Sequence, residues 1–233
     1  EDNNFSSKTS QPSPQQYLQA YKELAEEDCS DIIVITISSG LSGTYNSARI
    51  AAKNFKMMNS NIDIHIVDSR NASYSEVFLL EKGFELHEKG LSAGEIAEKL
   101  RLCRKHIKTY LYLPTLKYLH RGGRISIAKY LLARLLGKKA LVRTTEDGTI
   151  ESYKTINNHE AGLEAVFESV INSYDYKPQK LAIVHANAED FATQLEQIIK
   201  AKWPNVELRR VLTGTTIASH TGPSSVALIA DFN

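Results

Sequence analysis

Residues 32–45 of this chain read IIVITISSGLSGTY, and this stretch decides the fold class. The apolar, β-branched run at 32–37 predicts a strand that is buried on both faces, as strands of parallel sheets are. A turn rich in Ser and Gly ends this run, and a helical pattern follows at once, with Ala48, Ala51 and Phe55 on one face. This order predicts a strand–turn–helix unit, the repeating element of α/β folds.

The turn at 38–43 also predicts a binding site for an anion. The first N–H groups of a helix have no partner within the helix, the helix dipole favours negative charge there, and serine hydroxyls can donate. No Lys follows the glycines, and the spacing fits neither a P-loop, a dinucleotide fingerprint nor a nucleophile elbow. Neutral donors of this kind suit a carboxylate or a single phosphate. The residues alone leave open the alternative that Ser38, Ser39 and Ser42 only shape the turn and cap the helix.

The composition excludes several classes of protein. The chain has 233 residues, 42% of them hydrophobic, which is enough for a sizeable core in one or two domains. A formal net charge of +1 without a long block of one sign argues against a nucleic-acid binder. No signal peptide is visible, and no apolar stretch approaches the ~20 residues that span a bilayer. Cys29 and Cys103 belong to no C-x-x-C pair or Cys/His cluster. We therefore expect a cytoplasmic protein without a metal or a cofactor.

The periodicity predicts two α/β domains, residues 1–107 and 108–233. In the first we expect a parallel sheet, with strands at 32–37 and 62–67 and helices near 14–27, 44–58, 74–89 and 92–107. In the second we expect a mixed sheet, with strands at 109–113, 139–144, 149–154, 181–185, 206–212 and 226–230 and helices near 127–136, 158–173 and 188–202. The segment 119–126 has the composition of a loop.

Five short motifs occur in series along the chain. They are Thr9-Ser10-Gln11-Pro12-Ser13, the turn from Ser38 to Tyr45, Val67-Asp68-Ser69, Arg121-Gly122-Gly123-Arg124-Ile125 and His220-Thr221-Gly222-Pro223. In this order and spacing they resemble the DegV family, the bacterial fatty-acid-binding proteins that serve fatty-acid kinase. Each motif is weak alone, but the series is specific and spans nearly all of the chain. The resemblance implies two α/β domains with one extended lipid held between them.

The resemblance also implies a site for the carboxylate of a long-chain fatty acid. Thr9 and Ser42 would donate hydrogen bonds to it, with support from the backbone of Gly43 and from Ser10. His220 would approach from the second domain. A carboxylate cannot enter a low-dielectric site unpaired, so several donors must converge on it.

The same resemblance implies supporting residues and partners. Ser39 would support the carboxylate donors without contacting the ligand itself. Arg121 and Arg124 would lie near the mouth of the site, where a kinase or an acyl phosphate could dock. The chain has no nucleotide-binding motif, so ATP would come from the kinase. We expect no nucleic-acid partner and no integral membrane segment, with at most transient contact to a membrane surface.

Members of the family begin further upstream, with a strand that ends in an Asp-Ser motif. The first sheet of this chain is therefore expected to lack that N-terminal strand. The exposed edge of the neighbouring strand is expected to be covered by another copy of the chain, by a terminal segment or by residues outside this sequence.

Each candidate residue also has a plainer interpretation. Thr9 could cap the helix at 14–27, and His220 has the setting of an exposed turn residue. Asp68 could serve only to brace the neighbouring turn through hydrogen bonds. Arg121 and Arg124, which flank two glycines, have the setting of solvated loop charges.

Two other functional classes stay open at this point. The first is a hydrolase built from Ser42, His220 and Asp68, although this serine lacks a nucleophile elbow. The second is a regulatory interaction module, for which the Leu-rich helix at 127–136 could form a partner surface. We favour a non-catalytic carrier that presents the carboxylate of one fatty acid to a separate kinase.

Overall fold

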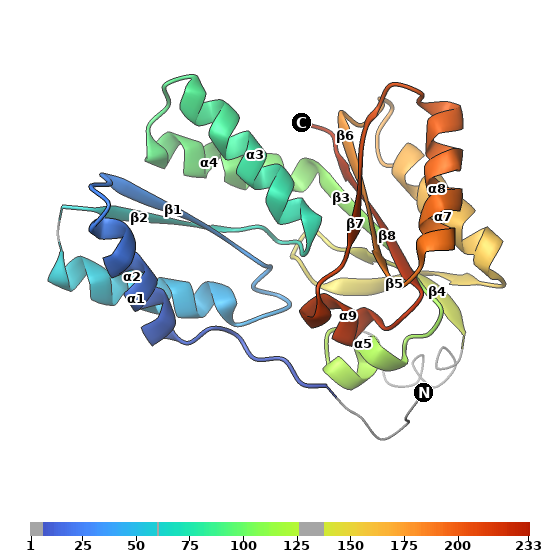
Figure 1. Ribbon diagram of the computed structural model, residues 1–233, viewed down its shortest axis with the longest axis horizontal. Helices are drawn as coiled ribbons and strands as arrows, with labels where there is room; N and C mark the ends of the chain where they lie inside the picture. The colour runs from blue at the N-terminus through green and yellow to red at the C-terminus, as the bar shows by residue number, and fades with distance from the viewer. Residues whose placement is uncertain (1–6, 60, 126–137) are drawn as a thin grey trace. The chain divides into compact units, whose positions relative to one another are not determined.

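The computed structural model describes residues 7–59, 61–125 and 138–233 (Figure 1). The chain divides into two compact units. The N-terminal unit comprises Gln11–His106 and Glu146–Gly148, and the C-terminal unit comprises Glu1–Ser10, Ile107–Thr145 and Thr149–Asn233. The Leu-rich helix predicted at 127–136 lies outside the described residues.

The N-terminal unit contains a two-stranded parallel sheet between two pairs of helices (Figure 1). Strand β1 (Asp31–Thr36) pairs with β2 (Asp63–Asp68), with Thr36 opposite Asp68. Helices α1 (Pro14–Ala25) and α2 (Thr44–Met58) cover one face, and α3 (Tyr74–Glu88) and α4 (Ala93–Cys103) cover the other. Ile32 packs with Tyr21 and Phe55 beneath α1 and α2.

Local signals explain where these helices begin and end. Ser13 caps α1 and forms a capping box with Gln16, and Ser92 forms the same motif with Glu95 at the start of α4. Gly90, with a φ of +81°, lies in the left-handed region just after α3 and permits the chain to turn there.

The C-terminal unit contains a six-stranded mixed sheet in the order β5-β4-β3-β8-β6-β7. Its strands are β3 (Ile107–Leu113), β4 (Lys139–Thr144), β5 (Ile150–Ile156), β6 (Lys180–Ala186), β7 (Glu207–Leu212) and β8 (Ser225–Asp231). Only β6 and β7 pair in parallel among these described strands. The predicted α/β class, with a parallel first sheet and a mixed second sheet, is therefore confirmed.

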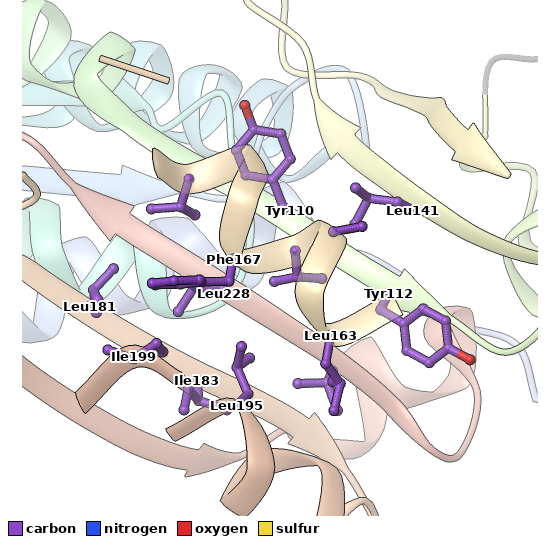
Figure 2. Packing of buried hydrophobic residues seen from close by; sticks show 14 of the residues in the cluster. Tyr110, Tyr112, Leu141, Leu163, Phe167, Leu181, Ile183, Leu195, Ile199 and Leu228 are labelled. Atoms are coloured by element: carbon purple, nitrogen blue, oxygen red, sulfur yellow. The ribbon is translucent and has the colours of Figure 1, made fainter. Parts of the chain in front are cut away.

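The main core of this unit lies between the sheet and helices α7 (His159–Ile171) and α8 (Glu189–Lys202) (Figure 2). Leu163 and Leu195 project from the two helices toward Ile183 and Leu228 of the sheet, and all four are buried. Burying each such side chain stabilises the fold by roughly 1.5–3 kcal/mol. In the described part of the chain, no helix has both the length and the apolar character that crossing a bilayer requires.

Two short helices occupy segments whose composition is typical of a loop and a turn. Helix α5 (Lys117–Gly122) overlaps the expected loop at 119–126, and that prediction was wrong. Helix α9 (Thr215–Thr221) contains His220, for which a turn was the plainer interpretation. Helices of six or seven residues span too few turns to show a 3.6-residue period in the sequence. The glycines of both motifs end these helices, with φ of +68° at Gly123 and +77° at Gly222.

Candidate functional site: a hydroxyl-lined turn and a Thr–His pair

The turn after β1 is held together by its first serine. The buried Ser38 donates its amide to the carbonyl of Asn71 at 2.8 Å and its hydroxyl to the carbonyl of Gly148 at 2.7 Å. The Ser38 carbonyl in turn accepts the amides of Leu41 and Ser42, both at 3.0 Å. Ser38 therefore shapes the turn, as the plainer interpretation expected.

Asp68, at the end of β2, braces the same turn. Its Oδ1 accepts the amides of Ser39 at 3.1 Å and Arg70 at 2.9 Å, and its Oδ2 accepts the Ser39 hydroxyl at 2.6 Å. This contact follows from the parallel pairing, because the carboxyl ends of β1 and β2 meet at one edge of the sheet. The hydroxyl of Ser39 is thus engaged within the turn.

Ser42, Gly43 and Thr44 form the open part of the turn, at the start of α2. Ser42 Oγ and Thr44 Oγ1 lie 2.8 Å apart, and either can be the donor. When the Thr44 hydroxyl donates this hydrogen bond, the hydroxyl proton of Ser42 can be donated to another acceptor. Gly43 is the N-cap residue and provides no side-chain cap, so amides of the first turn of α2 lack a partner within the helix. Hydroxyls and amides at the positive end of a helix dipole can together bind an anion.

Gln11, whose role the sequence did not reveal, lies against this turn. A Cβ atom at Gly43 would fall 2.0 Å from Gln11 Oε1, so any larger residue at Gly43 would displace that side chain. Gln11 Nε2 donates to Ser47 Oγ at 3.0 Å, which places Gln11 over the first turn of α2.

Sequence reasoning also missed a positive charge at this edge of the sheet. Arg104 Nη1 donates to the carbonyl of Asp68 at 2.5 Å. Burial, together with the charges of Arg70 and Arg101, lowers the pKa of Arg104, and Tyr45 of α2 lies within its electrostatic reach. No local signal could have found Arg104, because it lies just beyond α4 and far from the turn in the sequence.

In the C-terminal unit, Thr9 and His220 form a direct contact. Thr9 Oγ1 lies 2.8 Å from His220 Nε2, although the two residues stand near opposite ends of the sequence. Burial, followed by the charge of Arg124, lowers the pKa of His220. His220 Nδ1 is buried and has no hydrogen-bond partner among the described residues. Thr9 is not the cap of α1, because Ser13 has that role.

Gly122 permits this position of His220. A Cβ atom at Gly122 would fall 2.1 Å from His220 Nδ1, so α5 and α9 can approach each other only with glycine there. Arg124 Nη1 donates to the carbonyl of Gly122 at 2.5 Å and thereby remains close to the imidazole. The Arg-Gly-Gly-Arg motif thus positions the histidine of another motif.

The predicted site residues fall into two groups. Ser39, Ser42 and Gly43 lie together at the turn of the N-terminal unit, and Thr9 and His220 lie together in the C-terminal unit. Ser10 and Arg121 are exposed, and Arg124 is half-buried.

Hydroxyls, amides and an imidazole are groups that can hydrogen-bond to an acidic head group. The motifs that carry these residues occur in the order of a known family. The protein-family model described as "Uncharacterised protein, DegV family" matches residues 1–233. This chain belongs to the DegV family. The predicted family membership is therefore confirmed.

Three relatives of this DegV chain show the extent of the similarity. The "Fatty acid-binding protein" of Thermotoga maritima is 30% identical, over 94% of this chain and 75% of its own length. A crystal structure of a DegV lipid-binding protein from the same organism superposes with a TM-score of 0.84 at 28% identity, over 99% of this chain and 79% of that one. The Streptococcus pneumoniae Fatty Acid Kinase (Fak) B3 protein, crystallised with linoleic acid, superposes with a TM-score of 0.86 over 99% of this chain and 80% of that one. At 23% identity, the last comparison shows the fold alone.

Proposed function

We propose that this DegV chain is a non-catalytic carrier that holds one long-chain fatty acid and presents its carboxylate to a separate fatty-acid kinase. The observation that carries the proposal is the braced turn at 38–43, where the Ser42 hydroxyl can donate to an anion when Thr44 donates to it. The Thr44 amide donates to Ser42 Oγ at 3.3 Å, and the next amides of α2 lack a partner within the helix. The lipid-binding relatives at 28% and 30% identity support the choice of ligand.

In this proposal several donors bind one carboxylate. They are the Ser42 hydroxyl, the Gly43 amide, Thr9 and His220, with Ser10 in support. A carboxylate shielded from water needs several such donors, because each missing hydrogen bond to a buried charged group costs about 1–3 kcal/mol. The acyl chain adds roughly 0.8 kcal/mol for every buried methylene group. The tail therefore supplies most of the affinity, and the head group sets the orientation.

The proposed kinase provides what this chain lacks. The sequence contains no P-loop or dinucleotide motif, so a partner must bind ATP. Arg121, which is exposed, and Arg124 are the residues we propose for contact with that kinase or with an acyl phosphate. Ser39 would act indirectly, by fixing the turn that carries Ser42.

Native mass spectrometry tests this function directly. The purified protein is measured before and after extraction with organic solvent, and the extracted protein is then titrated with palmitate. We expect one fatty acid per chain before extraction and recovery of that complex on titration. Ser42→Ala and Thr9→Ala should lower occupancy, whereas Thr193→Ala, which removes an exposed hydroxyl of α8, should not. A protein that neither carries nor rebinds a fatty acid would contradict the proposal.

The serine hydrolase finds no support in the contacts of its three residues. His220 bonds to Thr9, and the oxygens of Asp68 accept hydrogen bonds from Ser39 and Arg70. A triad instead requires a carboxylate that orients the histidine. Turnover of p-nitrophenyl esters that is lost in Ser42→Ala would favour the hydrolase over the carrier.

A further inference from the structure

The segment Glu146–Gly148, here termed the hairpin tip, connects the antiparallel strands β4 and β5. Its contacts nevertheless group it with the N-terminal unit. The residues on either side of it, Thr145 and Thr149, bond to each other through their hydroxyls at 2.9 Å, and the Thr145 amide donates to the Thr149 carbonyl at 2.9 Å. The main-chain carbonyls of the hairpin tip are therefore presented by a closed three-residue loop.

The carbonyl of Gly148 holds the first serine of the turn at 38–43. It accepts the hydroxyl of Ser38 at 2.7 Å, and both residues are buried. The same hydroxyl accepts the amide of Gly40 at 3.1 Å, and the Ser38 carbonyl accepts the amide of Ser42 at 3.0 Å. A buried hydroxyl keeps its acceptor, because burial without a hydrogen bond is unfavourable. The position of Ser42 thus depends, through Ser38, on the hairpin tip.

A second contact joins the hairpin tip to the residues that brace the turn. Arg70 Nη1 donates to the carbonyl of Glu146 at 3.1 Å. Arg70 has a φ of +50°, a conformation that residues other than glycine rarely adopt. Its amide shares Asp68 Oδ1 with the amide of Ser39. Strained backbone persists where its surroundings hold it, and the hairpin tip supplies one of the contacts that hold Arg70.

The contact at Gly148 leaves no room for a side chain. A Cβ atom there would fall 2.1 Å from Ser38 Oγ and 2.9 Å from Arg70 Cα. Arg70 Cα belongs to the main chain, so no change of rotamer could relieve that overlap. Gly90 has the same φ of +81°, but among the described residues no atom lies within 4 Å of a Cβ added there. Gly148 therefore shares its backbone conformation with Gly90 and differs from it in touching the turn.

We propose that the hairpin tip is a positioning element of the fatty-acid site. By holding Ser38 and Arg70, it keeps Ser42 and the first amides of α2 in the arrangement that receives the carboxylate. The hairpin tip acts through Ser38 and does not itself contact the ligand. This inference rests on the proposed function, because it concerns the same ligand.

The alternative is that Gly148 serves the hairpin alone. Three-residue hairpin loops commonly place a glycine in the left-handed region, for reasons that involve no other part of the molecule. In that case Gly148→Ala and Gly90→Ala would both cost backbone strain, and neither would affect the turn at 38–43. The two substitutions therefore form a matched pair.

Hydrogen exchange tests the positioning in protein from which lipid has been extracted. Gly148→Ala should speed exchange of the Ser42 amide at least tenfold, measured by NMR, because a displaced Ser38 carbonyl no longer holds that amide. Gly90→Ala introduces the same strain at the same φ and should leave exchange at Ser42 unchanged. Equal exchange at Ser42 in the two variants would overturn the proposal.

Palmitate affinity tests whether the positioning reaches the ligand. Gly148→Ala should weaken binding at least fivefold relative to Gly90→Ala, measured by isothermal titration calorimetry. In a Ser42→Ala background the same substitution should weaken binding less than twofold, because the donor that it positions is already absent. Equal losses in the two backgrounds would assign Gly148 to general stability and contradict its positioning role.

Arg70→Ala tests the second contact and serves if Gly148→Ala does not fold. Arg70 is exposed, so the fold should survive the loss of its contact with the Glu146 carbonyl. Exchange of the Ser39 amide should rise at least threefold, whereas Arg209→Ala, at an exposed position of β7, should not change it. Unchanged exchange in Arg70→Ala would overturn the role of this contact. These exchange measurements need no ligand, so an unmodified chain that fails to bind palmitate would contradict the proposed function separately.

Discussion

Ser39 and Ser42 lie in the same turn, yet their hydroxyls have different partners. Ser39 donates its hydroxyl to Asp68 and so stabilises the turn. The Ser42 hydroxyl instead pairs, within the described part of the chain, with Thr44, whose own hydroxyl can act as donor or acceptor. At the scale of single residues, the capacity to bind a ligand therefore depends on which donors the fold leaves available.

Ser42→Ala should weaken palmitate binding by about 1–3 kcal/mol, because a buried carboxylate would lose one hydrogen bond. Isothermal titration calorimetry measures the change, and the melting temperature verifies that the variant is folded. Thr193→Ala should retain the affinity of the unmodified chain. An unchanged affinity in Ser42→Ala would remove this serine from the site.

The pKa of His220 should rise when a fatty acid binds. Burial and the charge of Arg124 hold this pKa below its usual 6.5. A carboxylate nearby favours the protonated imidazole, so binding should take up a proton and strengthen as the pH falls through the raised pKa. NMR titration of the imidazole with and without palmitate measures the shift. Identical titration curves would show that His220 does not contact the ligand.

Helices α5 and α9 show how short elements determine a site. Neither has a recognisable period, but their close approach at Gly122 fixes the imidazole of His220 next to Thr9. The Arg-Gly-Gly-Arg motif therefore acts through packing between elements as well as through its charges.

Gly122→Ala should displace His220 and break its contact with Thr9, because the added methyl group would fall 2.1 Å from Nδ1. We expect a loss of about 1–3 kcal/mol in stability, measured by urea unfolding, and weaker palmitate binding. The control is Gly94→Ala in α4, where the nearest atom is His65 Cε1 at 3.5 Å. This control should gain up to about 1 kcal/mol through helix propensity. Equal effects of the two substitutions would contradict the proposed packing.

The raised pKa of one partly buried carboxyl group, that of Glu76, predicts that the stability of the whole molecule depends on pH. Burial raises the pKa of Glu76, in the first turn of α3, from 4.5 to about 7. Burial therefore favours the neutral form of this carboxyl, although the dipole at the start of a helix favours the charged form.

Urea unfolding at several pH values should show that ionisation of Glu76 lowers the free energy of unfolding. Because the folded pKa is higher than the unfolded one, stability is greatest below pH 4.5 with respect to Glu76 and falls as the pH rises to about 7. The loss is on the order of 3 kcal/mol, and Glu76→Gln should flatten the profile between pH 5 and pH 8. Glu88→Gln, an exposed position on the same helix, should leave the slope unchanged. A profile that keeps its slope in Glu76→Gln would contradict the assignment.

The sequence by itself determined the α/β class, most of the long elements and the family. The periods of apolar residues predicted α2 at its observed bounds and most other strands and helices to within a few residues, because burial imposes those periods locally. The Ser92–Glu95 capping box was predictable for the same reason, since its donors and acceptors lie within one turn.

Only the tertiary structure decided which polar groups are engaged and which are available. The partners of Ser38, Ser39 and His220 lie far away in the sequence, so no spacing could indicate that two serines brace the turn or that Thr9 contacts the histidine. A hydrogen bond or a cavity requires atoms from distant segments to meet, and folding alone brings them together.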